Sequence, residues 1–119
     1  MPILDVEIVG RADEAQADLV QKIADAAGVA LDSRPQGTWV KLRFVSESMY
    51  AENGGAVDQP PIIVSVVQAQ PPSGAELKAQ MARLAAAIAE VTERKPESVH
   101  ILYEPPARGR IAFGGVLVD

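Results

Sequence analysis

Apolar residues are arranged along this chain in runs that predict four β-strands. Residues 3–9 and 62–68 consist mostly of valine, isoleucine and leucine, a composition typical of strands that are largely buried. Residues 38–45 alternate between apolar and polar side chains, so this strand is expected to present different chemistry on its two faces. Residues 99–103 form the fourth predicted strand.

Two stretches with helical spacing lie between these strands. Residues 12–31 carry an apolar stripe that predicts a helix with one buried face. A longer helix is predicted after Ser73, which has the spacing of a capping box with Glu76, and this helix must end before Pro96. Residues 110–118 are interrupted by two glycines and predict a short hairpin.

The second half of the chain repeats the first. An apolar run begins at Pro61, 59 residues after the run that begins at Pro2, and the pairs Gly54-Gly55 and Gly114-Gly115 are 60 residues apart. Because each half has the order strand, helix, strand, the chain is interpreted as a duplicated β-α-β unit.

A single domain, residues 1–119, is expected to contain both repeats, 1–58 and 60–119. Two right-handed β-α-β units predict an α/β (α+β) fold with a four-stranded mixed sheet and both helices on one face. The opposite face is then expected to be bare and apolar, and self-association is the simplest way to cover it.

Composition narrows the range of functions. The net charge of −5 argues against nucleic acid as a partner. With no cysteine and one histidine, neither a thiolate nor a histidine-rich metal site is expected, and no cofactor is predicted. No apolar run approaches membrane-spanning length and no signal-like segment opens the chain, so we expect no membrane partner and a cytoplasmic location.

Pro2 is the candidate for chemistry. A residue as small as proline at this position normally permits removal of the initiator methionine, which would leave a secondary amine at the head of a strand. An N-terminal amine titrates at roughly pH 7.7–8.0, and lower in an apolar pocket or beside cations. Pro2 is therefore a candidate general base.

Three features together carry a resemblance to a known family: Pro2, Gly10-Arg11 after the first strand, and the Gly-Gly pair near the end of each repeat. With them the chain resembles the tautomerase superfamily, the group of 4-oxalocrotonate tautomerase, in its fused, two-unit form. The resemblance implies the tautomerase fold and a homotrimer whose open sheet faces line a central barrel. It also implies an isomerase that moves a proton between carbon and oxygen of a small unsaturated 2-oxo acid, with the N-terminal proline as base.

The resemblance also implies substrate-binding residues. Arg11 matches the family's substrate-binding arginine and would hold a carboxylate with two parallel hydrogen bonds. Lys41 or Arg43, on one face of their strand, takes the place of a second family cation, and the alignment leaves open which of them does so. His100 occupies the corresponding strand position in the second repeat.

Two aromatic residues complete the predicted site. Tyr50 lies near the position of the family's pocket aromatic, and Trp39 is a second candidate for the pocket wall, with core or interface packing as its alternative role. Only one site per chain is expected, because the nitrogen of Pro61 is a tertiary amide bonded to Pro60 and has no basicity. In addition, Gln70-Pro71 stands where the first repeat has Gly10-Arg11.

Two other functions stay open. The same proline, when protonated, would serve a hydratase or dehalogenase of 3-substituted acrylates, with Glu47, Glu52 or Glu104 available to activate water. The non-enzymatic alternative is a trimeric scaffold or small-ligand binder with a weakened site.

Overall fold

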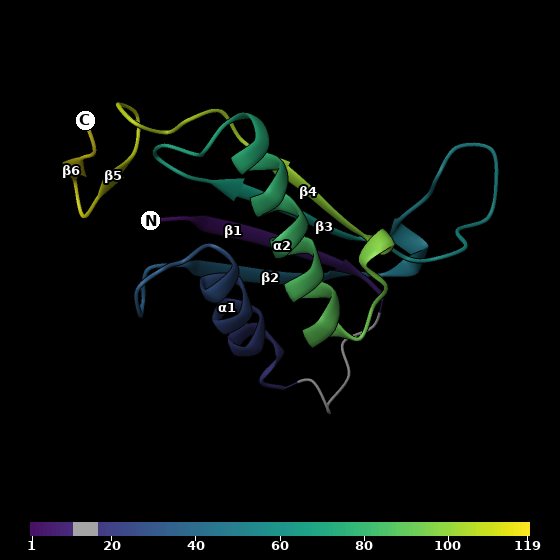
Figure 1. Cartoon of the computed structure of the whole chain (residues 1–119). Helices are drawn as coiled ribbons and strands as arrows, with labels where there is room; N and C mark the ends of the chain where they lie inside the picture. Colours follow the sequence, from purple (N-terminus) through teal and green to yellow (C-terminus); the bar gives the residue numbers. More distant parts are fainter. Residues whose placement is uncertain (11–16) are drawn as a thin grey trace.

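Four strands form one mixed sheet in the computed structural model, which describes residues 1–10 and 17–119 (Figure 1). The strands are β1 (Ile3–Val9), β2 (Trp39–Val45), β3 (Ile62–Val67) and β4 (Val99–Tyr103). They are ordered β2-β1-β3-β4, with β1 parallel to β2, β3 parallel to β4 and β1 antiparallel to β3. Each β-α-β unit therefore contributes a parallel pair, and the two units meet along β1 and β3.

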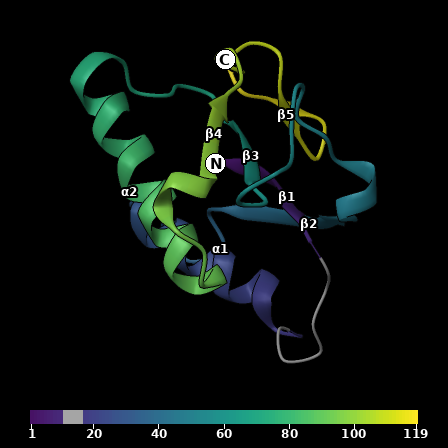
Figure 2. The same ribbon diagram turned by 90° about the vertical axis from the view of Figure 1, so that its right-hand side faces the viewer.

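Both helices pack on the same face of this sheet (Figure 2). α1 (Leu19–Ala30) lies between β1 and β2 in the chain, and α2 (Gly74–Thr92) lies between β3 and β4. The predicted four-stranded mixed sheet with two helices on one face is thus confirmed. Neither helix in the described part of the chain is long and apolar enough to cross a membrane.

Alternate residues of β1 and β3 form the centre of the core. Side chains that point toward the helices are almost fully buried, whereas their neighbours along each strand are partly exposed. The buried set comprises Leu4, Val6, Ile8, Ile62, Val64 and Val66 from the strands and Ile23, Ala27, Leu84 and Ile88 from the helices. Burial of one large aliphatic side chain contributes about 1.5–3 kcal/mol relative to its exposure to water, so this set holds the helices on the sheet.

α1 begins later than the sequence pattern predicted. The helix was predicted to begin at residue 12, but residues 17–18 form a turn and the helix begins at Leu19. The prediction is therefore wrong at residues 17 and 18. Residues 12–16 lie outside the described residues. Leu19 is the first buried residue of the apolar stripe, which continues through Ile23. A helical turn without an apolar face gains little from packing, and packing supplies most helical stability.

α2 begins and ends where predicted, although the predicted capping interaction is wrong. Ser73 is the N-cap residue and has an extended backbone, but its side chain makes no capping hydrogen bond. The helix ends at Thr92, and Glu93 adopts a left-handed conformation with φ of 57°. This turn redirects the chain before Pro96, as the proline required.

Short segments complete the fold. β5 (Ala112–Phe113) pairs with β6 (Val116–Leu117), which confirms the predicted hairpin. The connecting residues Gly114-Gly115 have φ values of 59° and 84°, which suit a two-residue turn that requires positive φ at both positions. Two 3₁₀ turns, η2 (Glu47–Met49) and η3 (Pro96–Ser98), follow β2 and precede β4.

The face of the sheet away from the helices is mixed, so the expectation of a bare apolar face is wrong. Asp5 pairs with Lys41 and Glu7 pairs with Arg43, each at a nitrogen–oxygen distance of 3.1 Å. These acids alternate with the buried residues of β1, and each lies directly opposite its base on β2. Apolar residues share this face, among them Ile3, Trp39, Ile63, Val67 and Leu102.

Candidate functional site

A groove lies at the N-terminal end of β1, beside Pro2. Its volume is about 680 Å³, and its lining residues are Met1, Arg34, Pro35, Gln36 and Trp39. Pro2 is buried next to this groove, and its carbonyl accepts a hydrogen bond from the Trp39 N–H at 3.0 Å. Because Met1 itself lines the groove, removal of Met1 would open the Pro2 nitrogen to it.

Arg34 is a cation of this groove that the sequence interpretation missed, because residues 33–37 were treated only as a loop. The loop is held by a hydrogen bond from the Gly37 N–H to the Arg34 carbonyl at 2.9 Å. A Cβ on Gly37 would lie 2.8 Å from that carbonyl, so the tight turn requires glycine. The Arg34 side chain is exposed and forms no ion pair with any residue of the described chain.

Trp39 forms the aromatic wall of the groove. Its indole N–H donates to the Gln36 carbonyl at 3.0 Å, which ties the ring to the same loop that carries Arg34. Its ring also meets Phe113 of β5 edge to face, with centroids 5.4 Å apart, so the terminal hairpin packs against this end of the sheet. Trp39 is thus both a packing residue and a groove residue.

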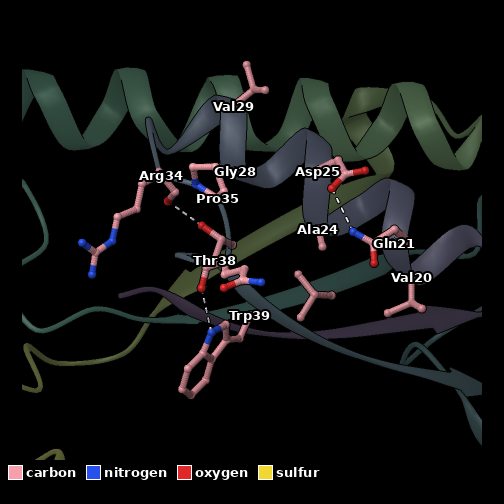
Figure 3. Close-up of a pocket in the computed structure, with 13 residues that line it drawn as sticks. Val20, Gln21, Ala24, Asp25, Gly28, Val29, Arg34, Pro35, Thr38 and Trp39 are labelled. Carbon is pink, nitrogen blue, oxygen red and sulfur yellow. Dashed lines mark hydrogen bonds between the residues drawn. The ribbon is translucent and has the colours of Figure 1, made fainter. Parts of the chain in front are cut away.

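A second groove, of about 760 Å³, continues along the outside of α1 and β2 (Figure 3). It shares Arg34, Pro35, Gln36 and Trp39 with the first, so the cation lies where the two grooves meet. Its helix side includes Val20, Ala24 and Gly28, and its far end carries the hydrogen-bonded pair Gln21 and Asp25. A small acid bound at Arg34 would therefore have room for an apolar tail along α1.

Lys41 and Arg43 lie away from Pro2 within one chain. Both point to the open face of the sheet and pair with Asp5 and Glu7. Pro2 is two residues before the buried Leu4, so its side chain lies on the opposite, helix-facing side of the sheet. Neither cation reaches the groove of its own chain, and the prediction that one of them binds substrate stays a prediction.

Tyr50 and His100 are also remote from Pro2 within one chain. Tyr50 follows η2 beyond the C-terminal end of β2. Because β2 is parallel to β1, this end of the sheet is opposite to the N-terminus. Its hydroxyl donates to the Glu52 carboxylate at 2.6 Å, and this hydrogen bond raises the pKa of Tyr50. His100 is exposed on the open face, in register with Ile63. Arg11 lies outside the described residues. Of the predicted substrate-binding residues that the structure describes, Trp39 is the one that lines the groove beside Pro2.

The carboxylates considered for water activation are divided between the two ends of the sheet. Glu47 and Glu52 lie beyond β2, with Tyr50. Glu104 follows β4 at the Pro2 end, but it lines a smaller cavity of about 340 Å³ together with Asp5 and Arg110. None of the three lines the groove beside Pro2.

Within residues 1–10 and 17–119, no three His, Asp or Glu side chains gather as a metal ion would require.

Tyr103, the last residue of β4, points toward the helices and donates its hydroxyl to the side-chain oxygen of Gln80. Burial raises the pKa of Tyr103. This hydrogen bond satisfies the buried side-chain amide of Gln80.

Comparison with known proteins places the fold. No protein-family model and no curated protein matches this sequence. Among solved structures, F6 fused 4-OT, an asymmetric trimer, superposes with a TM-score of 0.79 at 20% identity, over 98% of this chain and 95% of that chain. Pt0534 inactivated by 2-oxo-3-pentynoate gives a TM-score of 0.77 at 16% identity, over 98% and 95%. A macrophage migration inhibitory factor homologue from Prochlorococcus marinus gives 0.72 at 14% identity, over 98% and 99%.

This chain has the tautomerase-superfamily fold. Its two β-α-β units superpose on the fused 4-OT structures over 98% of this chain, so the predicted fold is confirmed over nearly its full length. Because these three structures share 20% or fewer of their residues with it, the chemistry of this tautomerase-fold chain has to be argued from its own side chains.

Proposed function

We propose that this chain is a tautomerase that acts on a small unsaturated 2-oxo acid, with the amine of Pro2 as general base. The observation that carries the proposal is the position of Pro2, which is buried beside a groove that holds the exposed cation Arg34 and the aromatic ring of Trp39. A base, a carboxylate-binding cation and an apolar wall are what proton transfer on a conjugated carboxylate needs.

Arg34 holds the substrate carboxylate with its guanidinium fork and stabilises negative charge that develops toward the enolate. The Pro2 nitrogen takes a proton from the enol hydroxyl or the adjacent carbon and returns it at the other position. Substrate and product are therefore isomers, and the reaction consumes no cofactor. Trp39 keeps one side of the groove apolar, which favours the uncharged amine at cellular pH.

The chain is proposed to work as a homotrimer in which each subunit is one domain formed by the repeats 1–58 and 60–119. Fused 4-OT structures similar to this chain are trimers. None of Lys41, Arg43, His100 and Tyr50 lines the groove beside Pro2 of its own chain, so a neighbouring subunit is the route by which they would reach a groove. The prediction that Arg11 binds substrate belongs to the same proposal.

Two preparations of the protein test the proposed base: one with Met1 removed, and one extended by a residue that keeps the Pro2 nitrogen acylated. Mass spectrometry establishes the N-terminus of each. Ketonisation of 2-hydroxymuconate and of phenylenolpyruvate is then measured. We expect turnover by the processed chain and its loss in the acylated chain, because an amide nitrogen cannot accept the proton.

Equal rates in the two preparations would rule out Pro2 as the base. Halide release from 3-chloroacrylates without ketonisation would favour the hydratase or dehalogenase alternative. Saturable binding of the acids with no turnover of any of them would favour a ligand-binding protein.

A further inference from the structure

Gln68, directly after β3, carries a buried polar atom that has no hydrogen-bond partner. Its side-chain oxygen Oε1 is shielded from solvent and meets no donor in the part of the chain that the structure describes. Its main-chain carbonyl is paired, since it accepts a hydrogen bond from the Ala107 N–H at 3.0 Å. Buried acceptors are nearly always paired, so an unpaired one in a well-anchored residue needs a physical explanation.

The register of the sheet places Gln68 beside Pro2. Ile3 pairs with Val67, so the next antiparallel pair outward is Pro2 with Gln68. This pair does not exchange main-chain hydrogen bonds, because the Pro2 carbonyl bonds to Trp39 on the other side. Side chains of such a pair are close, with Cβ atoms about 4.5–5.5 Å apart. Pro2 is two residues from Leu4, and Gln68 is two residues from Val66. Because Leu4 and Val66 are fully buried against the helices, the side chains of Pro2 and Gln68 lie on the same helix-facing side.

Pro2 is also the residue whose nitrogen has no hydrogen to offer while Met1 is attached. Removal of Met1 converts this tertiary amide into a secondary amine, which carries one N–H when neutral and two when protonated. The unpaired acceptor Gln68 Oε1 therefore belongs to the residue across from Pro2, whose nitrogen becomes a hydrogen-bond donor only after Met1 is removed.

We propose that Gln68 is a positioning residue for the base: once Met1 is removed, its Oε1 accepts a hydrogen bond from the Pro2 amine. The inference rests on the proposed function of Pro2. With the N–H held on the Gln68 side, the lone pair of the neutral amine points away from Gln68 and toward the groove that contains Arg34. When the amine is protonated, its second N–H faces the substrate.

The charged groups around Pro2 do not change when Gln68 is replaced. Arg34 faces the groove from the loop before β2, and the Asp5–Lys41 pair lies on the opposite face of the sheet. Glu104 and Arg110 line the smaller cavity with Asp5, and Arg83 of α2 lies near Tyr103. A hydrogen bond to the charged amine favours its protonated form. Loss of the Gln68 amide should therefore lower the pKa of the Pro2 amine.

The experiment compares Gln68→Leu with Gln70→Leu, a matched change of an exposed glutamine two residues away. In processed protein labelled with ¹⁵N-proline, the Pro2 amine is titrated by NMR, and kcat and KM are measured against pH. We expect Gln68→Leu to lower the pKa of Pro2 by about one unit and kcat by about tenfold, with KM almost unchanged, because a bond to a charged group is lost. Gln70→Leu should match the wild type in each measurement.

Thermal unfolding of the processed and the acylated forms gives a second readout. Gln68→Leu should lower the Tm of the processed form only, since the acylated nitrogen has no hydrogen to donate. An unchanged Pro2 pKa together with an equal change of Tm in both forms would overturn the proposal. The titration does not depend on turnover, so the role of Gln68 and the proposed reaction can fail separately. If the wild type is inactive but Gln68→Leu still lowers the pKa of the Pro2 amine, only the proposed reaction is contradicted.

Discussion

The two β-α-β units differ most clearly in the use of one arginine. Arg34 precedes β2, which begins at Trp39, by five residues, and Arg94 precedes β4, which begins at Val99, by the same number. Arg34 is exposed in the groove beside Met1. Arg94 is partly buried and donates to the Pro60 carbonyl at 2.8 Å and to the Val9 carbonyl at 3.0 Å. One unit presents its cation to a groove, and the other uses it to bind main chain.

Gly10 shows how closely Arg94 fits the ends of β1 and β3. Its φ of 138° is unfavourable for other residues, and a Cβ there would lie 3.0 Å from the Arg94 guanidinium. The Pro61 nitrogen, bonded to Pro60, is an amide. In the second unit the proline nitrogen is not basic, and the arginine is already hydrogen-bonded to main-chain carbonyls. The comparison teaches that the position that offers a cation to a groove in one unit can serve, in the other, to hold the ends of two strands together.

The largest expected difference between the units concerns their prolines. Pro2→Ala should lower kcat/KM by about 100-fold or more, because it replaces the constrained secondary amine that acts as base. Pro61→Ala should leave the rate within about twofold. Steady-state kinetics with 2-hydroxymuconate measures both variants, with the Tm of each as a folding control. Similar losses in the two variants would contradict the assignment of one site per chain.

Arg34 should be the next most sensitive position. Arg34→Ala should reduce kcat/KM for acidic substrates by about 10–100-fold, since a charge-assisted hydrogen bond contributes about 1.5–3 kcal/mol. Its Tm should not change, because the side chain is exposed. Arg108→Ala, which removes another exposed loop cation, is the control and should keep the wild-type kinetics. Wild-type kinetics in Arg34→Ala would show that this cation does not bind substrate.

Arg94 should matter for stability. Arg94→Ala leaves two main-chain carbonyls without their donor and should lower the free energy of unfolding by about 2 kcal/mol. Arg94→Lys should recover only part of the loss, since one ammonium does not replace the guanidinium fork. Urea unfolding measures both variants against Arg34→Ala. If Arg94→Ala and Arg34→Ala were equally stable, the contrast between the two arginines would be wrong.

Alkaline pH should weaken the packing of β4 on α2. Burial raises the pKa of Tyr103 above its usual value of 10.0, so the folded protein holds this proton more tightly than the unfolded chain. The stabilisation is complete below the unfolded pKa, and the free energy of unfolding should fall as the pH rises past about 10. Urea unfolding between pH 8 and 11 measures this slope, which should be smaller in Tyr103→Phe. An equal slope in Tyr103→Phe would assign it to other groups.

The smallest expected effect concerns the ion pairs of the first unit. The register positions Asp5–Lys41 and Glu7–Arg43 of β1 and β2 carry charge pairs, whereas β3 and β4 have Ile63–His100 and Ser65–Leu102 in their register. Exposed pairs contribute about 0.2–1 kcal/mol, so Glu7→Gln should lower stability by less than about 1 kcal/mol, and less in high salt. In Arg43→Met, the loss of kcat/KM and the loss of stability are both expressed as free energies. If the loss of kcat/KM is the larger, it would support the prediction that Arg43 binds substrate in the groove of a neighbouring subunit.

Much of the local structure followed from the sequence. The bounds of β1 and β4, the start of β3 at Ile62, the end of α2 before Pro96 and the Gly114-Gly115 hairpin were all predicted. Each depends on residues close in the chain, through strand alternation, helical spacing or turn chemistry. The late start of α1 was missed because propensity extends a helix where packing does not support it.

The site depended on contacts that sequence spacing does not encode. The 59-residue repeat aligns Ile3 with Ile62, yet Ile3 is partly exposed on the open face and Ile62 is fully buried. A shift of one residue moves a side chain to the other face of a sheet, so similar sequences in the two units acquire different neighbours.

By itself, the sequence determined the order of the elements, the buried stripe of each helix, the resemblance to the tautomerase fold and the choice of Pro2 as the candidate base. Only the tertiary structure decided that Arg34 and Trp39 line one groove with Met1, that Lys41 and Arg43 pair with acids on the open face, and that Ile3 pairs with Val67, the register from which the Pro2–Gln68 pair follows. The physical reason is that periodicity assigns a side chain to a face, whereas strand order and register, set by packing of the whole chain, choose its partner.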